Sequence, residues 1–290
     1  MAMSRRGFLK HTLVSVGAAA ALPRMAAGAP PGIRLSACDW SLSAKGPEGL
    51  QKAKAAGLAG LEISAGGPAD SITLADPKVR TAYKKQMAET GIAVSSVAMG
   101  FLNGAPLATD PRGPKWLEQT IDAAADLETK VVLLAFFGNG DLRDKRGALK
   151  PGAVDAVVQR VKNAAPHAAE KGVILGLENT LSGAQNLAIL ERIGSDAVQV
   201  YYDVGNSTYN GYDVPAELRA LDKRICQIHF KDGKHYLGQG RVDMQPVAKA
   251  MADIGYDGWV VLETACPGGD SVADFQRNAK FTRALLKRNA

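Results

Sequence analysis

Four side chains that can bind a metal ion stand at or near the ends of four apolar segments in the second half of the chain. They are three carboxylates and one imidazole: Glu178, Asp203, His229 and Glu263. Three carboxylates gathered in apolar surroundings raise one another's pKa, and a divalent cation would keep them ionised together. Oxygen-rich ligation with one nitrogen favours Mn²⁺ or Mg²⁺, with Co²⁺ or Zn²⁺ as alternatives. Each residue alone is as well explained as a helix cap, an ion-pair partner or a core histidine, but their coincidence favours a metal site.

These four residues can meet only if the apolar segments are parallel strands of one sheet. Eight short runs rich in Val, Ile and Leu recur along the chain, at residues 33–38, 60–64, 93–99, 131–137, 173–177, 198–202, 225–228 and 259–262. They are continuous rather than alternating in hydropathy, which is typical of strands covered on both faces. Helix-like segments separate them, for example at residues 115–128, 153–171 and 274–287. Several of these segments end in a glycine that is placed as a C-cap: Gly57, Gly91 and Gly172.

This alternation predicts one α/β domain over residues 30–290, a (β/α)₈ TIM barrel with roughly 32 residues per unit. An open doubly wound sheet is the alternative. A dinucleotide-binding version of that sheet would need G-x-G-x-x-G after the first strand, and residues 36–45 contain no glycine. In a barrel, the carboxyl ends of all strands meet at one rim, where we expect the four candidate ligands to converge.

Residues 1–29 have the pattern of an export signal. Residues 4–10 read S-R-R-G-F-L-K, an alanine-rich apolar stretch follows, and small residues close the segment. The pair Arg5 and Arg6, followed by Phe8 and Leu9, resembles the twin-arginine class of signal peptides. We therefore expect the folded protein to be exported to the periplasm by the Tat machinery, without a stable membrane anchor. A basic amphipathic surface helix is the alternative interpretation.

Composition excludes several classes of protein. With 46% hydrophobic and 22% charged residues, and no unbroken apolar stretch near 20 residues, the chain is neither disordered nor membrane-spanning. Four of the six net positive charges lie in residues 1–29, and the remaining +2 is too little for a nucleic-acid surface.

The three cysteines are Cys38, Cys226 and Cys266. Because their number is odd and two lie in strand-like runs, we expect free thiols.

From about residue 32 to 288, the chain resembles the xylose-isomerase-like superfamily of TIM barrels, in the sugar phosphate isomerase/epimerase group. Glu178 ends a strand, Asp203 lies in Y-D-V-G-N, His229 in H-F-K-D and Glu263 in L-E-T, and residues 237–243 match a glycine-rich element of the family. The resemblance implies that these four residues hold one divalent metal. It also implies that Glu178 and Glu263 transfer protons on opposite sides of a sugar, as in an isomerase or epimerase working through a metal-stabilised enediolate.

Five further residues are candidates for contacts with the substrate. Ketose epimerases tend to have a histidine where this chain has Asn206, and an arginine where it has His235. These differences weaken the assignment as a ketose 3-epimerase. Lys231 and Trp40 are also candidates, as is Glu62, which we expect to point to the mouth from the second strand. For these three residues, ion pairing or packing is the alternative.

Three rival functions are compatible with a metal-binding barrel. A DNA-repair endonuclease of the same superfamily needs three zinc ions and many histidines, but only His167, His229 and His235 lie outside the signal. A lyase or dehydratase could use the same proton abstraction on keto-sugars or keto-glycosides. A non-catalytic carbohydrate-binding protein should lack a ligand, and none of the four is missing. We therefore expect an isomerase or epimerase for a small sugar or keto-sugar, without phosphate because sugar phosphates are scarce outside the cytoplasm. An assembly of identical chains is compatible with the sequence.

Overall fold

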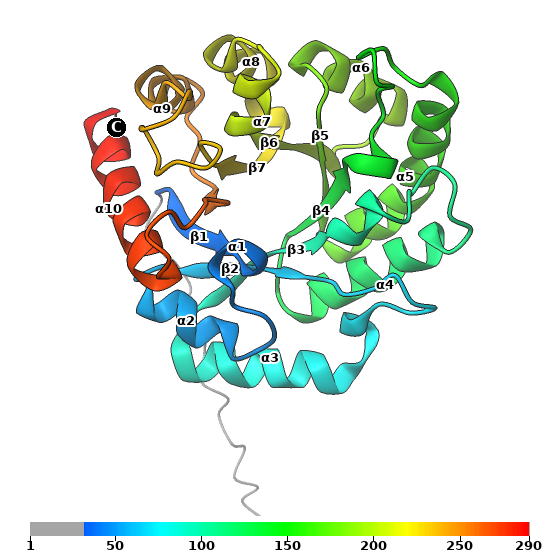
Figure 1. Cartoon of the computed structure of the whole chain (residues 1–290). Coiled ribbons are helices and arrows are strands. Elements are labelled where there is room, and N and C mark those ends of the chain that lie inside the picture. Colours follow the sequence, from blue (N-terminus) through cyan, green and yellow to red (C-terminus); the bar gives the residue numbers. More distant parts are fainter. Residues whose placement is uncertain (1–31, 290) are drawn as a thin grey trace, which may run out of the picture. The chain divides into compact units, whose positions relative to one another are not determined.

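The computed structural model describes residues 32–289, which form a closed barrel of eight parallel strands in sequential order (Figure 1). The strands are β1 (Arg34–Cys38), β2 (Gly60–Ser64), β3 (Ala93–Met99), β4 (Val131–Phe136), β5 (Ile174–Asn179), β6 (Val198–Asp203), β7 (Ile225–Phe230) and β8 (Trp259–Leu262). Pairing of β1 with β8 closes the ring. The predicted (β/α)₈ barrel is therefore confirmed. The expected export signal lies outside the described residues.

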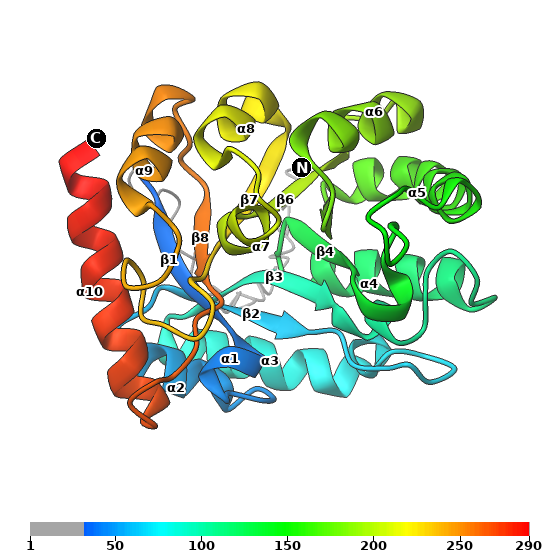
Figure 2. The same ribbon diagram turned by 45° about the horizontal axis from the view of Figure 1, so that its top comes forward.

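Helices connect the strands and cover the outside of the barrel (Figure 2). They are α1 (Asp39–Leu42), α2 (Gly49–Ala55), α3 (Pro77–Thr90), α4 (Gly113–Asp126), α5 (Pro151–Lys171), α6 (Gly183–Ile193), α7 (Val204–Tyr209), α8 (Val214–Leu221), α9 (Met244–Asp253) and α10 (Ser271–Asn289). Gly91 and Gly172 end α3 and α5 with φ of 75° and 67°, the left-handed conformation that their predicted capping role requires. In the described part of the chain, we find no helix with the length and apolarity to cross a bilayer.

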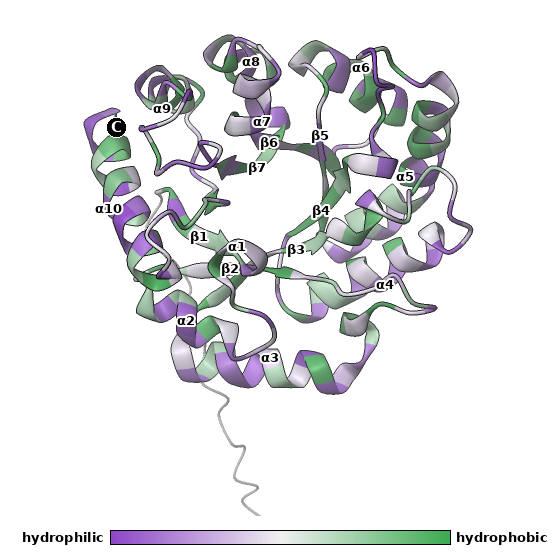
Figure 3. Cartoon of the chain, in the orientation of Figure 1, coloured by the Kyte–Doolittle hydropathy of each residue, from purple (hydrophilic) through white to green (hydrophobic). Residues whose placement is uncertain are grey.

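The apolar core is built from the strands and from the inward faces of the helices around them. Figure 3 shows mostly apolar strands inside and mixed polar and apolar helices outside. The largest fully buried side chains include Trp116, Phe136, Phe230 and Phe275. The three cysteines are free thiols, as predicted, with Cys38 fully buried at the end of β1. Burial on both faces explains why the strand sequences are continuously apolar rather than alternating.

Strands β5, β6 and β7 extend one or two residues beyond the predicted apolar runs, and these added residues include candidate ligands. β5, β6 and β7 end at Asn179, Asp203 and Phe230, so three of the candidate ligands lie within strands. Asp203 and His229 are register partners across β6 and β7. Glu263 directly follows β8, and its backbone N–H still donates to the carbonyl of Phe230 at 3.0 Å. Paired backbone therefore positions all four side chains.

Candidate metal centre and active site

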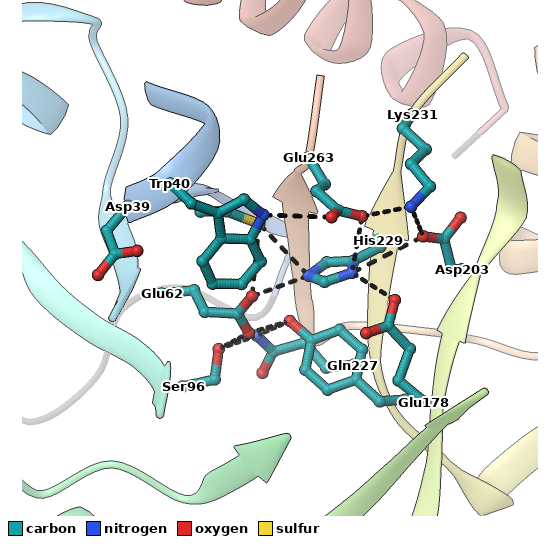
Figure 4. Close-up of polar contacts among 12 residues, drawn as sticks. Asp39, Trp40, Glu62, Ser96, Glu178, Asp203, Gln227, His229, Lys231 and Glu263 are labelled. Atoms are coloured by element: carbon teal, nitrogen blue, oxygen red, sulfur yellow. Dashed lines mark hydrogen bonds and ion pairs between the residues drawn. The ribbon is translucent and has the colours of Figure 1, made fainter. Parts of the chain in front are cut away.

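The four candidate ligands converge at the carboxyl end of the barrel (Figure 4). The His229 Nδ1 atom lies 3.0 Å from Glu178 Oε1, 3.5 Å from Glu263 Oε2 and 3.8 Å from Asp203 Oδ2. One ligand atom from each of the four residues lies within 4.8 Å of all the others. Bonds from such ligands to a divalent metal are about 2.0–2.2 Å long, so atoms this close can contact one common cation after small side-chain adjustments.

The chemistry of the donor set also fits a metal ion. Three carboxylates and one imidazole nitrogen are the ligands that a hard divalent cation prefers. His229 is fully buried and Asp203 nearly so, whereas the Glu263 side chain is 20% exposed. Glu178 is also buried, so Glu263 is the one partly exposed ligand of the four.

Glu62 lies beneath this cluster and not at the mouth, where the sequence predicted a substrate contact. Its side chain is fully buried, and its Oε1 atom lies 2.9 Å from His229 Nε2. β2 continues to Ser64, which leaves Glu62 one layer below the rim. The Glu62 carboxylate therefore faces the opposite edge of the imidazole ring from the other three carboxylates (Figure 4).

A buried polar network holds the Glu62 carboxylate in place. Tyr201 Oη and Ser96 Oγ donate to Glu62 Oε2 at 2.6 Å and 2.5 Å. Gln227 Nε2 in turn donates to Ser96 Oγ and Tyr201 Oη at 2.8 Å and 2.9 Å. Acceptance of the Nε2–H of His229 by Glu62 favours the tautomer whose Nδ1 lone pair faces the candidate ligands. This is the arrangement in which a carboxylate orients a metal-binding histidine.

The electrostatics of the cluster separate the two glutamates. Burial raises the pKa of Glu178 to about 7, against the opposing effect of His229. Burial acts in the same direction on Glu263, but His229 and Lys231 outweigh it and hold the pKa of Glu263 at about 2. Burial alone would lower the pKa of His229, but Cys38, Glu62 and Glu178 raise it well above its ordinary value. His229 and Lys231 thus offset part of the negative charge of the carboxylates, and a divalent cation could offset the rest.

Lys231 and Trp40 hold the two oxygens of Glu263. Lys231 Nζ lies 2.6 Å from Glu263 Oε2 and 2.9 Å from Asp203 Oδ2. Trp40 Nε1 donates to Glu263 Oε1 at 3.2 Å. Lys231 directly follows β7, and Trp40 lies in the short helix after β1. Both residues, predicted as substrate contacts, therefore lie beside the cluster and also orient one of its carboxylates.

Asn206 lies at the same rim, in the first turn of α7. Its backbone N–H donates to Asp203 Oδ1 at 2.7 Å and so caps the helix. The side-chain Nδ2 atom is buried and has no hydrogen-bond partner among residues 32–289. Asn206 also lines the cavity above the cluster.

A cavity of about 530 Å³ opens above the cluster. Its polar lining comprises Trp40, Ser64, Asn103, Glu178, Asn206, Lys231 and Glu263. The rest is mainly apolar and includes Leu133, Ala135, Phe101 and Phe137. A volume within the range of about 300–1,000 Å³ is typical of small-molecule sites. Asp203 and His229 are not part of the lining, so a ligand in the cavity meets the two glutamates directly.

The remaining predicted contact, His235, is not brought to the cavity. It is exposed on the loop after β7 and does not line the cavity. The path of this loop is set by the fully buried Asp232, whose carboxylate accepts hydrogen bonds from the backbone N–H groups of Gly240 and Val242. These bonds fold the loop back on itself.

Sequence reasoning missed the network around Glu62 and the role of Phe101 as a cavity wall. Tyr201 and Gln227 are polar residues inside otherwise apolar strands, a signal that could have revealed the network. Phe101 lies in a short 3₁₀ turn after β3 and belongs to no motif.

Comparisons with known proteins agree with this geometry. The family described as xylose isomerase-like TIM barrel matches residues 50–285. A 2-epi-5-epi-valiolone 7-phosphate 2-epimerase from Actinoplanes sp. is 26% identical over 204 residues, which cover 69% of this chain and 73% of that protein. An inosose dehydratase from Erwinia tasmaniensis is 30% identical over 126 residues, covering 33% of this chain and 42% of that protein.

The fold also matches solved structures. The structure of an L-ribulose 3-epimerase superposes with a TM-score of 0.74 at 22% identity, covering 89% of this chain and 95% of that one. The family match spans the barrel from α2 to α10 and confirms the resemblance inferred from the motifs. The chain belongs to the xylose isomerase-like TIM barrel family.

Proposed function

We propose that the protein is a divalent-metal-dependent sugar isomerase or epimerase that moves a proton at a carbon next to a carbonyl group. One observation carries the proposal. Of the four converging ligands, only Glu178 and Glu263 line the cavity, while Asp203 and His229 lie beneath it. A pair of proton-transfer groups requires two carboxylates that a ligand in the cavity can contact, and these two meet that requirement. The similarity to an epimerase over most of the chain supports the same reaction class.

The residues of the chain would divide the work as follows. Asp203, His229 and the two glutamates would hold the cation, which when bound polarises a sugar carbonyl and acidifies the neighbouring C–H group. Glu178 and Glu263 reach the cavity from β5 and from the end of β8, on different sides of His229. One carboxylate accepts the proton from carbon, and the other returns a proton to the opposite face or to the adjacent carbon. The first outcome is epimerisation and the second is isomerisation.

Lys231 and Trp40 prepare Glu263 for this role. Each of them binds a different oxygen of the carboxylate, which fixes its orientation. The ammonium group of Lys231 also favours the ionised form of Glu263, the form that accepts a proton. Asn206 Nδ2, which has no partner in the described part of the chain, would donate a hydrogen bond to a sugar hydroxyl.

The reaction is tested by proton exchange with solvent. The Mn²⁺-loaded protein is incubated with keto-sugars in D₂O, and incorporation of deuterium at carbon is followed by NMR. We expect deuterium in the sugar and the formation of an epimer or an aldose–ketose isomer. Absence of exchange with every carbonyl sugar, from protein that contains metal, would contradict the proposal.

A dehydratase is the second candidate, because the chain is 30% identical over 126 residues to an inosose dehydratase. The same carboxylate would abstract the same α-proton, and loss of the hydroxyl group on the β-carbon as water would follow instead of reprotonation. This reaction gives an unsaturated product, which the NMR experiment detects directly. An unsaturated product without an epimer would select the dehydratase.

We further propose that Mn²⁺ is the resident metal. The ligand set of three oxygens and one nitrogen supports a hard cation. Elemental analysis of protein purified without chelator tests the assignment. Stoichiometric zinc would contradict it.

We also propose that residues 1–29 direct the protein to the periplasm through the twin-arginine pathway. The support is the S-R-R-G-F-L-K sequence ahead of an apolar, alanine-rich stretch. Replacement of both Arg5 and Arg6 by lysine should leave the protein in the cytoplasmic fraction. Unchanged export of this variant would contradict the assignment.

A further inference from the structure

The cavity is poorly suited to a phosphate group at the end of the substrate that lies away from the metal cluster. We propose that it takes an unphosphorylated keto-sugar that carries an uncharged, flat-faced substituent, as in a keto-glycoside. This inference rests on the proposed function and concerns the part of the substrate that does not react. It separates the protein from the 7-phosphate epimerase to which it is similar.

The first observation concerns positive charge. Among the described residues that line the cavity, Lys231 is the only one with a cationic side chain. Its ammonium group lies 2.6 Å from Glu263 Oε2 and 2.9 Å from Asp203 Oδ2. A phosphate ester would have to compete with both carboxylates for this single cation. Phosphate sites normally offer arginine or lysine groups that are free to form charge-assisted hydrogen bonds.

The second observation concerns backbone donors. TIM barrels frequently bind phosphate through loops after the seventh and eighth strands. In this chain, the N–H groups of Gly240 and Val242, after β7, donate to the Asp232 carboxylate at 2.8 Å and 3.0 Å. The N–H of Gly268, after β8, donates to Asp274 Oδ2 at 2.8 Å. These amides already hold buried carboxylates of the protein, and a phosphate here would meet negative charge.

The third observation concerns the net charge of the site. The four ligand side chains contribute three negative charges when the imidazole is neutral, and Lys231 adds one positive charge. A divalent cation would bring this group of charges to zero. A neutral site does not attract a dianion electrostatically.

The wall opposite the cluster supplies apolar contact instead. β3 and β4 lie four strands away from β7 and β8 in the closed ring, so Phe101 and Phe137, which follow them, face Lys231 and Glu263 across the mouth. Glycines extend this wall at positions 66, 67 and 100. Gly67 has φ of 113°, and a Cβ atom there would lie 3.4 Å from the Phe101 ring. Aromatic faces and bare backbone suit the apolar face of a sugar ring or an aromatic aglycone.

Matched substrates test the inference. Metal-loaded protein is given a free ketohexose, the phosphate ester of the same ketohexose, and phenyl 3-keto-glucoside. Binding is measured by calorimetry, and deuterium exchange is measured by NMR. We expect the keto-glycoside to bind at least tenfold more tightly than the phosphate ester. Equal or tighter binding of the phosphate ester would overturn the inference even if deuterium exchange occurs. If the glycoside binds as expected but no compound exchanges deuterium, the proposed reaction fails while the binding preference stands.

Variants of the aromatic wall give the second test. Phe101→Ala and Phe137→Ala should weaken binding of the keto-glycoside about 3- to 10-fold and change binding of the free ketohexose less than twofold. Metal content should be unchanged. Leu149→Ala is the control, because Leu149 is exposed and lies outside the cavity lining. An equal loss for both ligands, or no loss for either, would contradict contact between this wall and a substituent.

Discussion

The two edges of the His229 ring face two regions of opposite character. Beneath the ring, the Glu62 carboxylate is surrounded by donors: the Nε2–H of the ring, Tyr201 and Ser96. Above it, three carboxylates meet around Nδ1 and share only a few donors, chiefly Lys231 and the backbone N–H of Asn206. Donors satisfy the carboxylate of the lower region, whereas the negative charge of the upper region is only partly offset. The two regions therefore differ in how well hydrogen-bond donors satisfy their buried carboxylates.

The largest expected effect comes from removing the reactive carboxylates of the upper region. Glu178→Gln and Glu263→Gln should each lower kcat by about 10²- to 10⁴-fold, because an amide can neither accept nor return the proton. The exposed Glu118→Gln serves as the matched control and should retain full activity. Turnover numbers and circular dichroism spectra of the metal-loaded variants make the comparison. Turnover near the wild-type value in Glu263→Gln would contradict the proton-transfer pair.

Glu62→Gln should weaken metal binding by changing the lower region, without removing a contact to the substrate. An amide NH₂ facing Nε2 would favour the tautomer that points a proton toward the metal site. Loss of such an orienting carboxylate typically weakens metal affinity about 10- to 100-fold. Competition with a chromogenic chelator measures this affinity without reference to activity. An unchanged metal affinity would contradict the role of Glu62 in orienting His229.

The metal-free protein should lose stability as pH rises from about 4.5 to about 7. The pKa of Glu178 is raised to about 7 by burial, so over this range the unfolded chain ionises while the folded chain stays protonated. The raised pKa of His229 acts in the same direction above pH 6.5. For Glu178 the loss is about 3 kcal/mol at most, or several degrees in Tm. Thermal unfolding with EDTA measures it.

Two controls sharpen this prediction. Glu178→Gln should flatten most of the decline between pH 4.5 and pH 6.5. Saturating Mn²⁺ should also reduce it, because a bound cation favours the ionised carboxylate. A Tm of the metal-free protein that rises over this pH range would contradict the excess of negative charge in the upper region.

The smallest effect on metal affinity is expected from Tyr201→Phe. This change removes one of the four donors to Glu62 but leaves the imidazole, Ser96 and Cys38 contacts in place. We expect less than a tenfold change in metal affinity and a loss of about 1–3 kcal/mol in the free energy of unfolding. Urea denaturation and the chelator assay measure the two quantities. If Tyr201→Phe lost more metal affinity than Glu62→Gln, Tyr201 would matter more for metal binding than Glu62, contrary to the prediction.

The barrel and its cluster were predictable because few rules determine them. Continuous apolar runs indicate strands covered on both sides, and parallel strands in a ring bring their carboxyl ends to one rim. Asp203 and His229 therefore meet although 26 residues separate them. Depth along a strand is harder to predict. Glu62 was expected at the mouth, but two further residues follow it in β2 and its side chain is fully buried.

Loops were the least predictable part of the molecule. His235 and Phe101 both lie on segments without a regular repeat. The path of the loop that carries His235 depends on hydrogen bonds from residues eight and ten positions beyond Asp232. Such contacts depend on the folded geometry and leave no periodic pattern in the sequence.

Pairing of β1 with β8 brings residues from the first and last strands of the barrel together at the candidate site. Trp40 and Glu263 are 223 positions apart, yet they share a hydrogen bond beside the ring closure. Without β8, the ring of strands would stay open and the cluster would lack the carboxylate that lies 2.6 Å from Lys231 Nζ, so closure of the barrel and completeness of the ligand set depend on the same strand.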